Sequence, residues 1–250
     1  MRLLGFDLET TGLDWKKERI LEIGISLHLA NDPVYLHQTS WTLYDEEIEK
    51  RLPLTPEITR LTGLKSEAIS EFGIHPTTAL RELEQYCIDR KVDFIVGHNC
   101  TDFDRPFLLH ELDKFGIQSP CLRGLPWIDT RKDIPYPQGH EPRQRSLEHL
   151  LMQKRFIPSI SHRALSDAEN TMWLLSHYPF EQVLEYWEKP WRVVCLDVGY
   201  EDRAIAKQNG YSWQECGNKY YSKKWVKLLK EDLISEEQKK FPEHQLKVLE

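Results

Sequence analysis

The chain has few cysteines, no cysteine pairs and no long apolar run. Its five cysteines among 250 residues are odd in number and form no Cys-x-x-Cys pair. This argues against a disulfide framework or a zinc site and favours the reduced thiols of a cytoplasmic protein. No apolar run approaches the roughly 18 residues of a membrane-spanning helix. Only Leu3–Phe6 separate Arg2 from the first acidic residue, whereas a secretory signal has an apolar region of about 7 residues or more. We therefore expect a cytoplasmic protein with no membrane partner.

The chain has no internal repeat. Basic residues are not in excess over acidic ones, so the distribution of charge along the chain is more informative than the net charge. The net charge of −7 argues weakly against a nucleic-acid partner. Residues 190–250, however, carry eleven Lys/Arg and ten Asp/Glu, a net of +1, which leaves −8 for residues 1–189. Residues 203–230 hold seven basic residues and one acidic residue. A basic segment on an acidic body is compatible with phosphate binding.

The first part of the chain predicts three strands. Leu3–Glu9, Ile20–His28 and Val34–Leu43 are rich in branched or aromatic residues, and short turn-like stretches separate them. Such short connections predict an antiparallel meander. With 40% hydrophobic residues, the chain can bury the core of one large domain, with or without a small appendage.

After residue 53, helical patterns alternate with short strands, which predicts a mixed sheet with helices packed on its faces. The expected strands are Phe94–Gly97 and Trp127–Thr130. The expected helices are Pro56–Thr62 ended by Gly63, Pro76–Ile88, Arg105–Phe115, and Ser146–Leu151 and Ser166–Tyr178 with their first serines as N-caps.

The helical pattern weakens after Tyr178, and Lys189-Pro190 is a natural boundary between two domains. We expect one domain over residues 1–182 and a small basic and aromatic α+β module over residues 190–250. The elements expected in the module are a strand at Arg192–Val198, a helix at Asp202–Asn209, an aromatic and basic stretch, and a polar tail.

Two carboxylates stand close together in the first apolar strand. Asp7 and Glu9 are two residues apart, and side chains at i and i+2 of a strand point to the same face. Neighbouring carboxylates in an apolar element repel each other, and a cation that prefers oxygen ligands, such as Mg²⁺ or Mn²⁺, would remove that cost. A solvated strand face is the alternative interpretation, and this pair alone does not exclude it.

Three motifs extend this observation. Two hydroxyl residues and a glycine follow the carboxylates directly in Asp7-Leu8-Glu9-Thr10-Thr11-Gly12-Leu13. A short strand leads into polar residues and an aspartate at a helix start in Gly97-His98-Asn99-Cys100-Thr101-Asp102-Phe103-Asp104. A histidine precedes an aspartate by five residues in His162-Arg163-Ala164-Leu165-Ser166-Asp167-Ala168. Together and in this order, the motifs resemble those of the DnaQ-like, or DEDDh, family of 3′–5′ exonucleases.

The resemblance covers roughly residues 2–178, and Glu22-Ile23-Gly24 and Leu61-Thr62-Gly63-Leu64 fit the same pattern. It implies a ribonuclease H-like fold, a mixed five-stranded sheet flanked by helices. It also implies an enzyme that hydrolyses phosphodiester bonds from the 3′ end of DNA or RNA and releases nucleoside 5′-monophosphates. The chain departs from many relatives at Thr62, where they have a histidine.

The resemblance implies a general base and four ligands for two Mg²⁺ or Mn²⁺ ions: His162, and Asp7, Glu9, Asp104 and Asp167. Paired metal ions can generate hydroxide and stabilise a leaving 3′ oxygen, and a histidine can accept a proton near neutral pH. Asp102 is the alternative to Asp104. The family's aspartate directly follows an aromatic residue, as Asp104 follows Phe103, so we expect Asp102 to be the N-cap of the next helix.

The resemblance also implies contacts with the substrate. It places Thr10, Gly12 and Leu13 along the 3′-terminal nucleotide, together with Asn99. Phe103 either stacks on a base or belongs to the core. We expect single-stranded nucleic acid or a 3′ overhang as the partner, with DNA and RNA both open and no oligomeric state favoured.

Cations and aromatic rings alternate in the C-terminal segment, as they do in surfaces that bind single strands. In the alternative interpretation, Trp213, Tyr221 and Trp225 form the core of the module and the lysines are its solvated rim. The residues concerned are Arg203, Lys207, Lys219, Lys223, Lys224, Lys227 and Lys230, with Tyr211, Trp213, Tyr220, Tyr221 and Trp225.

Two other functions remain as alternatives. A binding or adaptor protein would keep the fold without turnover, although degenerate relatives usually lack a carboxylate or the histidine, and this chain retains all of them. An enzyme for short or cyclic oligonucleotides would keep the chemistry and change the substrate.

Overall fold

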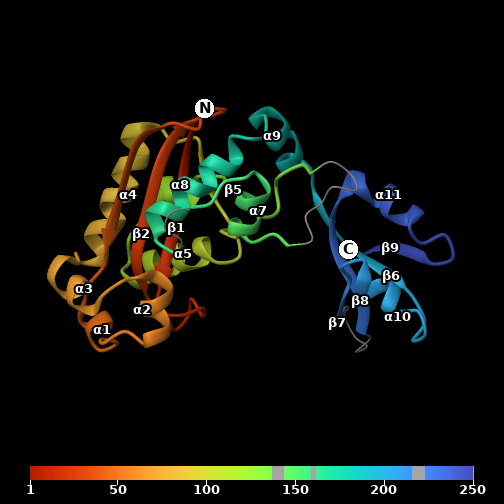
Figure 1. Cartoon of the computed structure of the whole chain (residues 1–250), viewed down its shortest axis with the longest axis horizontal. Coiled ribbons are helices and arrows are strands. Elements are labelled where there is room, and N and C mark those ends of the chain that lie inside the picture. The colour runs from red at the N-terminus through yellow and green to blue at the C-terminus, as the bar shows by residue number, and fades with distance from the viewer. Residues whose placement is uncertain (137–143, 159–161, 216–222, 250) are drawn as a thin grey trace. The chain divides into compact units, whose positions relative to one another are not determined.

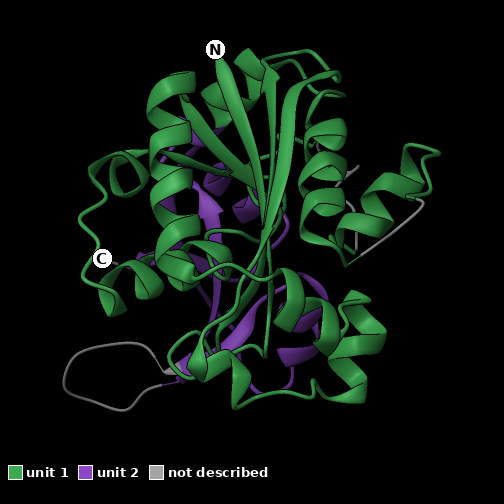
Figure 2. Ribbon diagram, turned by 90° about the vertical axis from the view of Figure 1, so that its left-hand side faces the viewer, with its two compact units in different colours: residues 1–186 green, residues 187–250 purple. Residues whose placement is uncertain are grey.

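The structure, a computed structural model, describes residues 1–136, 144–158, 162–215 and 223–249 (Figure 1). The chain forms two compact units, Met1–Tyr186 and Trp187–Glu250, which Figure 2 colours separately. None of the described helices is long and apolar enough to cross a bilayer.

The first unit is built on a mixed five-stranded sheet, which confirms the expected fold class. Its strands are β1 (Arg2–Thr10), β2 (Ile20–Leu29), β3 (Tyr35–Thr42), β4 (Phe94–Gly97) and β5 (Trp127–Asp129), in the order β3-β2-β1-β4-β5. The first three pair antiparallel as a meander, whereas β4 is parallel to β1 and β5 is parallel to β4. Nearly every residue of β2 is buried, because this strand lies between β3 and β1 in a sheet covered on both faces.

Helices flank this sheet on both sides (Figure 2). They are α1 (Glu46–Glu49), α2 (Pro56–Thr62), α3 (Ser66–Phe72), α4 (Pro76–Arg90), α5 (Asp104–Lys114), α6 (Pro120–Gly124), α7 (Leu147–Gln153), α8 (Ala164–Leu175) and α9 (Phe180–Glu188). The predicted end of α2 is confirmed, since Gly63 adopts a left-handed φ of 69° as its C-cap. The predicted N-cap Ser166 is wrong, because α8 begins at Ala164 and Ser166 lies in its first turn. Ser146 does precede α7, but its side chain makes no capping hydrogen bond.

Two glycines let α8 lie directly on the sheet. A Cβ atom at Gly24 in β2 would be 2.1 Å from the carbonyl carbon of Ala164 and 2.2 Å from the nitrogen of Leu165. A Cβ atom at Gly5 in β1 would be 2.8 Å from the carbonyl oxygen of Ala168. Only a residue without a side chain permits this approach. The N-terminal half of α8 is therefore held directly against β1, the strand of Asp7 and Glu9, and against its neighbour β2.

The described residues of the second unit form a four-stranded antiparallel sheet and three short helical segments. Its strands are β6 (Trp191–Asp197), β7 (Ser212–Glu215), β8 (Lys223–Lys230) and β9 (Gln245–Leu249), in the order β7-β8-β6-β9. The helical segments are α10 (Arg203–Gln208), the 3₁₀ turn η1 (Glu231–Leu233) and α11 (Ile234–Lys239). The expected polar tail is thus wrong: it folds into a helix and the edge strand β9.

The core of this unit differs from the one expected. Tyr211 and Phe241 are buried at its centre, with rings 5.8 Å apart, against residues of β6, β8 and α10. Trp225 packs against this core only partly buried, and Trp213 is 52% exposed. Tyr221, the third expected core residue, lies outside the described residues.

Candidate active site

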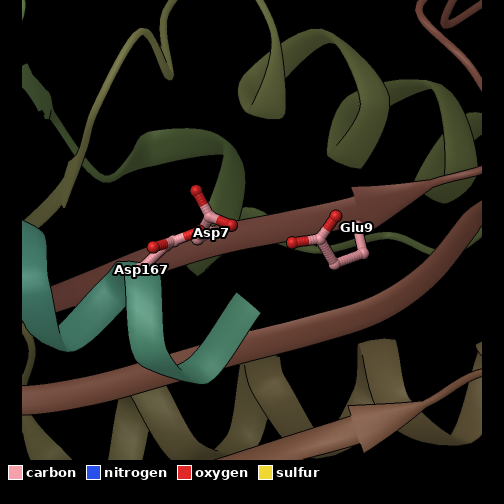
Figure 3. A group of neighbouring side chains, drawn as sticks. All are labelled: Asp7, Glu9 and Asp167. Carbon is pink, nitrogen blue, oxygen red and sulfur yellow. The ribbon is translucent and has the colours of Figure 1, made fainter. Parts of the chain in front are cut away.

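Three carboxylates from two distant segments meet beside β1. Asp7, Glu9 and Asp167 each offer an oxygen atom within 4.8 Å of the others. Asp7 and Glu9 lie on the same side of β1, and Asp167 reaches toward them from the first turn of α8 (Figure 3). The alternation of a strand fixes the first two, and the close packing of α8 on Gly5 and Gly24 places the third. Among the described residues, only these three form such a group.

Asp104 adjoins this acidic cluster from α5. It is the first residue of the helix and is 2% exposed, and the backbone N–H of Leu8 in β1 donates a hydrogen bond to its carboxylate. Its Oδ1 atom has no hydrogen-bond partner among the described residues. A buried carboxylate oxygen normally has a partner, so this atom is suited to a ligand that the protein itself does not supply.

Asp102 is not the N-cap that the sequence predicted. Phe103 occupies that position, and Asp102 instead forms an ion pair with Lys132 at 2.6 Å, with its side chain 65% exposed. Lys132 follows β5, some thirty residues along the chain, so the pair joins two segments at the carboxyl ends of β4 and β5. The carboxylate of Asp102 is therefore already paired with a cation, unlike Oδ1 of Asp104, which has no partner among the described residues.

The pKa of each of the four carboxylates is raised, first of all by burial. Burial, and then the charges of Asp104 and Asp167, raise the pKa of Asp7 well above its ordinary value. Burial, and then the charge of Asp167, raises the pKa of Glu9 to about 8. Burial also raises the pKa of Asp104 to about 8 and raises the pKa of Asp167. A site of this kind favours a bound cation, and its carboxylate oxygens are the ligands that Mg²⁺ and Mn²⁺ prefer.

His162 lies at the start of the segment that carries Asp167. It has a left-handed φ of 59°, and its backbone N–H donates a hydrogen bond of 2.8 Å to Asp167 Oδ2. Its half-exposed ring places Nε2 3.9 Å from Glu148 Oε1 of α7. Asp7, His162 and Asp167 all line the same pocket, so the structure brings the predicted base and two predicted metal ligands to one hollow.

Glu22 was noted only as part of a motif, yet it organises this segment. It stands opposite Glu9 in the β1–β2 pairing and is 1% exposed. Its carboxylate accepts hydrogen bonds from Arg163 Nη2 at 2.8 Å, Arg163 Nε at 3.1 Å and the backbone N–H of Ala164 at 3.2 Å. Arg163 and Ala164 lie between His162 and Asp167 in the chain, so these bonds hold the start of α8 on β2. A lone glutamate in an otherwise apolar strand is the feature of the sequence that could have identified it.

The second motif forms a turn held by a buried aspartate that the sequence analysis missed. Asp129, at the end of β5, accepts hydrogen bonds from the backbone of Asn99 at 2.8 Å and the hydroxyl of Thr101 at 2.8 Å. Asn99 has a left-handed φ of 64°. Phe103 packs against the hydrophobic core, with its ring 4.9 Å from that of Phe107. The structure therefore gives Phe103 a core contact, with part of the ring still accessible.

The turn after β1 places the remaining predicted contacts. The hydroxyl of Thr10 donates a hydrogen bond of 2.6 Å to the carbonyl of Gly12, which closes the turn. A Cβ atom at Gly12 would lie 2.9 Å from the side chain of Glu18. Leu13 follows directly and is 85% exposed, so it is available for an apolar contact with a ligand.

Comparisons with known proteins find exonucleases and a polymerase. A family model described as "Exonuclease" (RNase_T) matches residues 4–175. "Three prime repair exonuclease 2" of Homo sapiens is 25% identical over 194 residues, which are 68% of this chain and 80% of that protein. "DNA polymerase III PolC-type" of Mycoplasma genitalium is 31% identical over 125 residues, which are 50% of this chain but 8% of that protein.

A solved structure shares the fold. The nuclease domain of 3'hExo, described as a DEDDh family member bound to rAMP, superposes with a TM-score of 0.58 and 16% sequence identity. The similarity covers 70% of this chain and 90% of that domain. The expected ribonuclease H-like architecture of the first unit is thereby confirmed.

Proposed function

The chain belongs to the DnaQ-like family of 3′–5′ exonucleases, and we propose that it releases nucleoside 5′-monophosphates one at a time from the 3′ end of DNA or RNA. The acidic cluster of Asp7, Glu9 and Asp167, with oxygen atoms within 4.8 Å, is the observation that carries this proposal. Carboxylates this close are stable in their charged form only with bound cations. Cations held in this way suit the hydrolysis of a phosphodiester.

Exonucleases of this family generally use divalent metal ions. Asp7, Glu9, Asp104 and Asp167 would hold two Mg²⁺ or Mn²⁺ ions here, since all four offer hard oxygen atoms and one oxygen of Asp104 has no partner among the described residues. Such ions make an attacking water more acidic and stabilise negative charge on the leaving 3′ oxygen. The protein itself would hold the four carboxylates in place, two on β1 and one each on α5 and α8.

His162 would take the proton of the attacking water. Its backbone is tied to Asp167, so the ring is positioned relative to the acidic cluster by the same segment that supplies a ligand. The carboxylate of Glu148 lies 3.9 Å from Nε2 of this ring. The half-exposed ring can then pass the proton to solvent.

The substrate would be single-stranded nucleic acid or a 3′ overhang. Leu13, which is exposed beside the site, would pack against the 3′-terminal base, while the turn of Thr10 and Gly12 would contact its sugar through the backbone. Asn99 and the accessible part of Phe103, which lie between β4 and α5, would contact the same nucleotide. Because a stacked base is held through its face, these contacts suit any sequence.

The second unit would contribute further contacts with the strand. Trp213 of β7 is exposed and lies 5.3 Å from Trp225 of β8, ring to ring. Lys223, two residues before Trp225 in β8, points to the same face of the sheet as the two rings. Rings with adjacent cations bind single strands. A Trp213→Ala variant should bind oligonucleotides more weakly, by about 10-fold for one lost stacking contact.

A matched panel of single- and double-stranded DNA and RNA, labelled at the 5′ or the 3′ end, tests the proposal. With Mg²⁺ or Mn²⁺, 5′-labelled strands should shorten stepwise and 3′-labelled strands should lose their label at once as a mononucleotide. Internal cleavage products, or no cleavage of any member, would refute it. Metal binding without any hydrolysis would instead favour an adaptor protein.

The same panel separates the substrates by length. An enzyme for oligonucleotide remnants should hydrolyse a dinucleotide faster than a strand of about 20 nucleotides, whereas an enzyme for long strands gains binding energy from each added contact. The ratio of the two rates decides between them.

A further inference from the structure

The pocket beside the acidic cluster combines charges of both signs. Asp7 and Asp167 line it together with His162, and Arg131 and Arg145 line it as well. All of these residues belong to the first unit. The carboxylates would repel a polyanionic strand that approaches the acidic cluster. The guanidinium groups of Arg131 and Arg145 offset that repulsion within the same pocket.

Within the part of the chain that the structure describes, Arg131 and Arg145 lack the acidic partners that neighbouring cations have. Arg163 pairs with Glu22, and Lys132 pairs with Asp102. Among the described residues, neither Arg131 nor Arg145 forms an ion pair with a carboxylate. A guanidinium has five N–H donors in a planar fork that matches the geometry of a phosphate. Both side chains therefore keep donors for an anionic ligand in the pocket.

The arginines are nevertheless held in place. Arg131 Nη1 donates a hydrogen bond of 2.8 Å to the side-chain oxygen of Asn99, and Arg145 Nη1 donates one of 3.1 Å to the carbonyl of Arg131. The guanidinium of Arg145 also lies 5.3 Å from the centre of the Tyr136 ring. A cation that is already positioned loses less entropy on binding than one on a free side chain.

His98 fixes the backbone beside this pair. Its Nε2 donates a hydrogen bond of 2.8 Å to the carbonyl of Arg145, so Nε2 carries the proton. Its Nδ1 lies 2.9 Å from the hydroxyl of Thr130. His98 thus links the end of β4 to the segment before α7, and it gives that segment one defined position next to the acidic cluster.

We propose that Arg131 and Arg145 bind the phosphodiester that lies next to the scissile one on its 5′ side. This rests on the proposed exonuclease function and adds a subsite to it. With the scissile phosphate at Asp7 and Asp167, the 3′ nucleotide is the leaving product, and the rest of the strand continues on the 5′ side. Arg131 and Arg145 line the same pocket as Asp7 and Asp167. The phosphate on the 5′ side of the scissile one would therefore contact the two arginines.

The length of the substrate isolates this contact. The dinucleotide dTpdT has only the scissile phosphodiester, whereas dTpdTpdT adds the one on its 5′ side. We expect the wild-type protein to prefer the trinucleotide in kcat/KM. Arg131→Ala and Arg145→Ala should each lower the ratio of trinucleotide to dinucleotide kcat/KM by about 10-fold, the value of one charge-assisted contact near solvent. Ribonucleotides of the same lengths replace these substrates if the protein prefers RNA.

A matched control comes from Arg81→Ala, which removes the same charge from an exposed position of α4, outside the pocket. It should leave both rates and their ratio unchanged. Arg131→Lys keeps the charge without the fork and should recover part of the ratio. A wild-type ratio in Arg131→Ala and Arg145→Ala, or an equal fall for both substrates, would overturn the proposal.

Binding without metal gives a readout independent of turnover. The affinity for a fluorescein-labelled single strand of about ten nucleotides is measured by anisotropy in EDTA at several salt concentrations. Each arginine variant should lower the slope of log Kd against log salt by about 0.7, the value for one phosphate contact on a single strand. An unchanged slope in both variants would overturn the proposal. If the wild-type protein cleaves no substrate, the exonuclease function fails, and this slope still decides the role of the arginines.

Discussion

Replacing Gly24 with alanine should displace α8 from the sheet. The new Cβ atom would lie 2.1 Å from the carbonyl carbon of Ala164 and 2.2 Å from the nitrogen of Leu165. Both are backbone atoms at the start of the helix, so no rotation of a side chain relieves the contact. Overpacking a core costs about 1–3 kcal/mol, and a clash with backbone puts Gly24→Ala at about 3 kcal/mol. The expected fall in Tm is about 6–12 °C for a chain of this size.

The same displacement should lower activity at temperatures where the variant is still folded. Asp167 follows Ala164 by three residues, and its position relative to Asp7 depends on where α8 begins. A shift of about 1 Å at such a site costs on the order of 100-fold in rate. Circular dichroism gives Tm, and oligonucleotide cleavage well below Tm gives the rate.

Gly124→Ala is the matched control. A Cβ atom at Gly124, in α6, would meet nothing within 4 Å. Its φ lies outside the left-handed region that favours glycine, so alanine should be neutral or should stabilise the chain by up to about 1 kcal/mol. A Gly24→Ala variant with the Tm and the rate of the wild type would refute the direct packing of α8 on β2.

Three further predictions concern the charges of the site. Asp167→Asn should lower the single-turnover cleavage rate by about 100-fold or more, yet raise the Tm of the metal-free protein, because it removes one of the mutually repelling charges. The pKa values of Glu9 and Asp104, raised to about 8, mean that the metal-free folded protein binds more protons than the unfolded chain between about pH 4 and 8. Its free energy of unfolding in EDTA, measured with urea, should therefore fall as pH rises through that window, and Mg²⁺ should stabilise the protein more at about pH 8 than at about pH 6; a free energy that rises with pH would contradict the clustering. Arg163→Ala leaves the buried carboxylate of Glu22 without its cation and should lower the free energy of unfolding by about 1–2 kcal/mol, a value reduced because the Arg163 side chain is 41% exposed. In urea unfolding, the double variant with Glu22→Gln should recover stability. No recovery would show that the ion pair is not the cause.

The sequence predicted those features of the fold and the site that are determined by residues close together in the chain. The alternation of a strand was enough to place Asp7 and Glu9 on one face. The glycine that ends α2 was identified because only glycine tolerates a left-handed φ easily. The residue patterns predicted a mixed sheet with helices, and the resemblance of the three motifs to the DnaQ-like family implied that it has five strands.

Contacts between distant segments explain what the sequence did not predict. Asp102 was expected to cap α5, but Lys132 from beyond β5 binds its carboxylate instead. Glu22 and Arg163 are 141 residues apart, and neither residue alone indicates the pair. The start of α8 is set by Gly24 beneath it and not by a capping serine, which is why Ser166 was assigned wrongly.

The second unit was predicted less well because its elements are short and half-exposed. The alternation in β9 is weak, with no fully buried residue, so the segment resembled a polar tail. Its position depends on pairing with β6. Tyr211 and Phe241, which are close in space but thirty residues apart, form the core in place of the tryptophans.

Cleavage of a 5′-labelled single strand by the wild-type protein and by two variants tests the role of the acidic cluster and His162 most directly. In Mg²⁺ or Mn²⁺, the wild-type protein should produce a ladder that shortens from the 3′ end and should release nucleoside 5′-monophosphates. Asp167→Asn and His162→Ala should leave the strand intact on the same time scale while remaining folded. A strand that stays intact with the wild-type protein, or a ladder formed at the wild-type rate by either variant, would contradict the proposed active site.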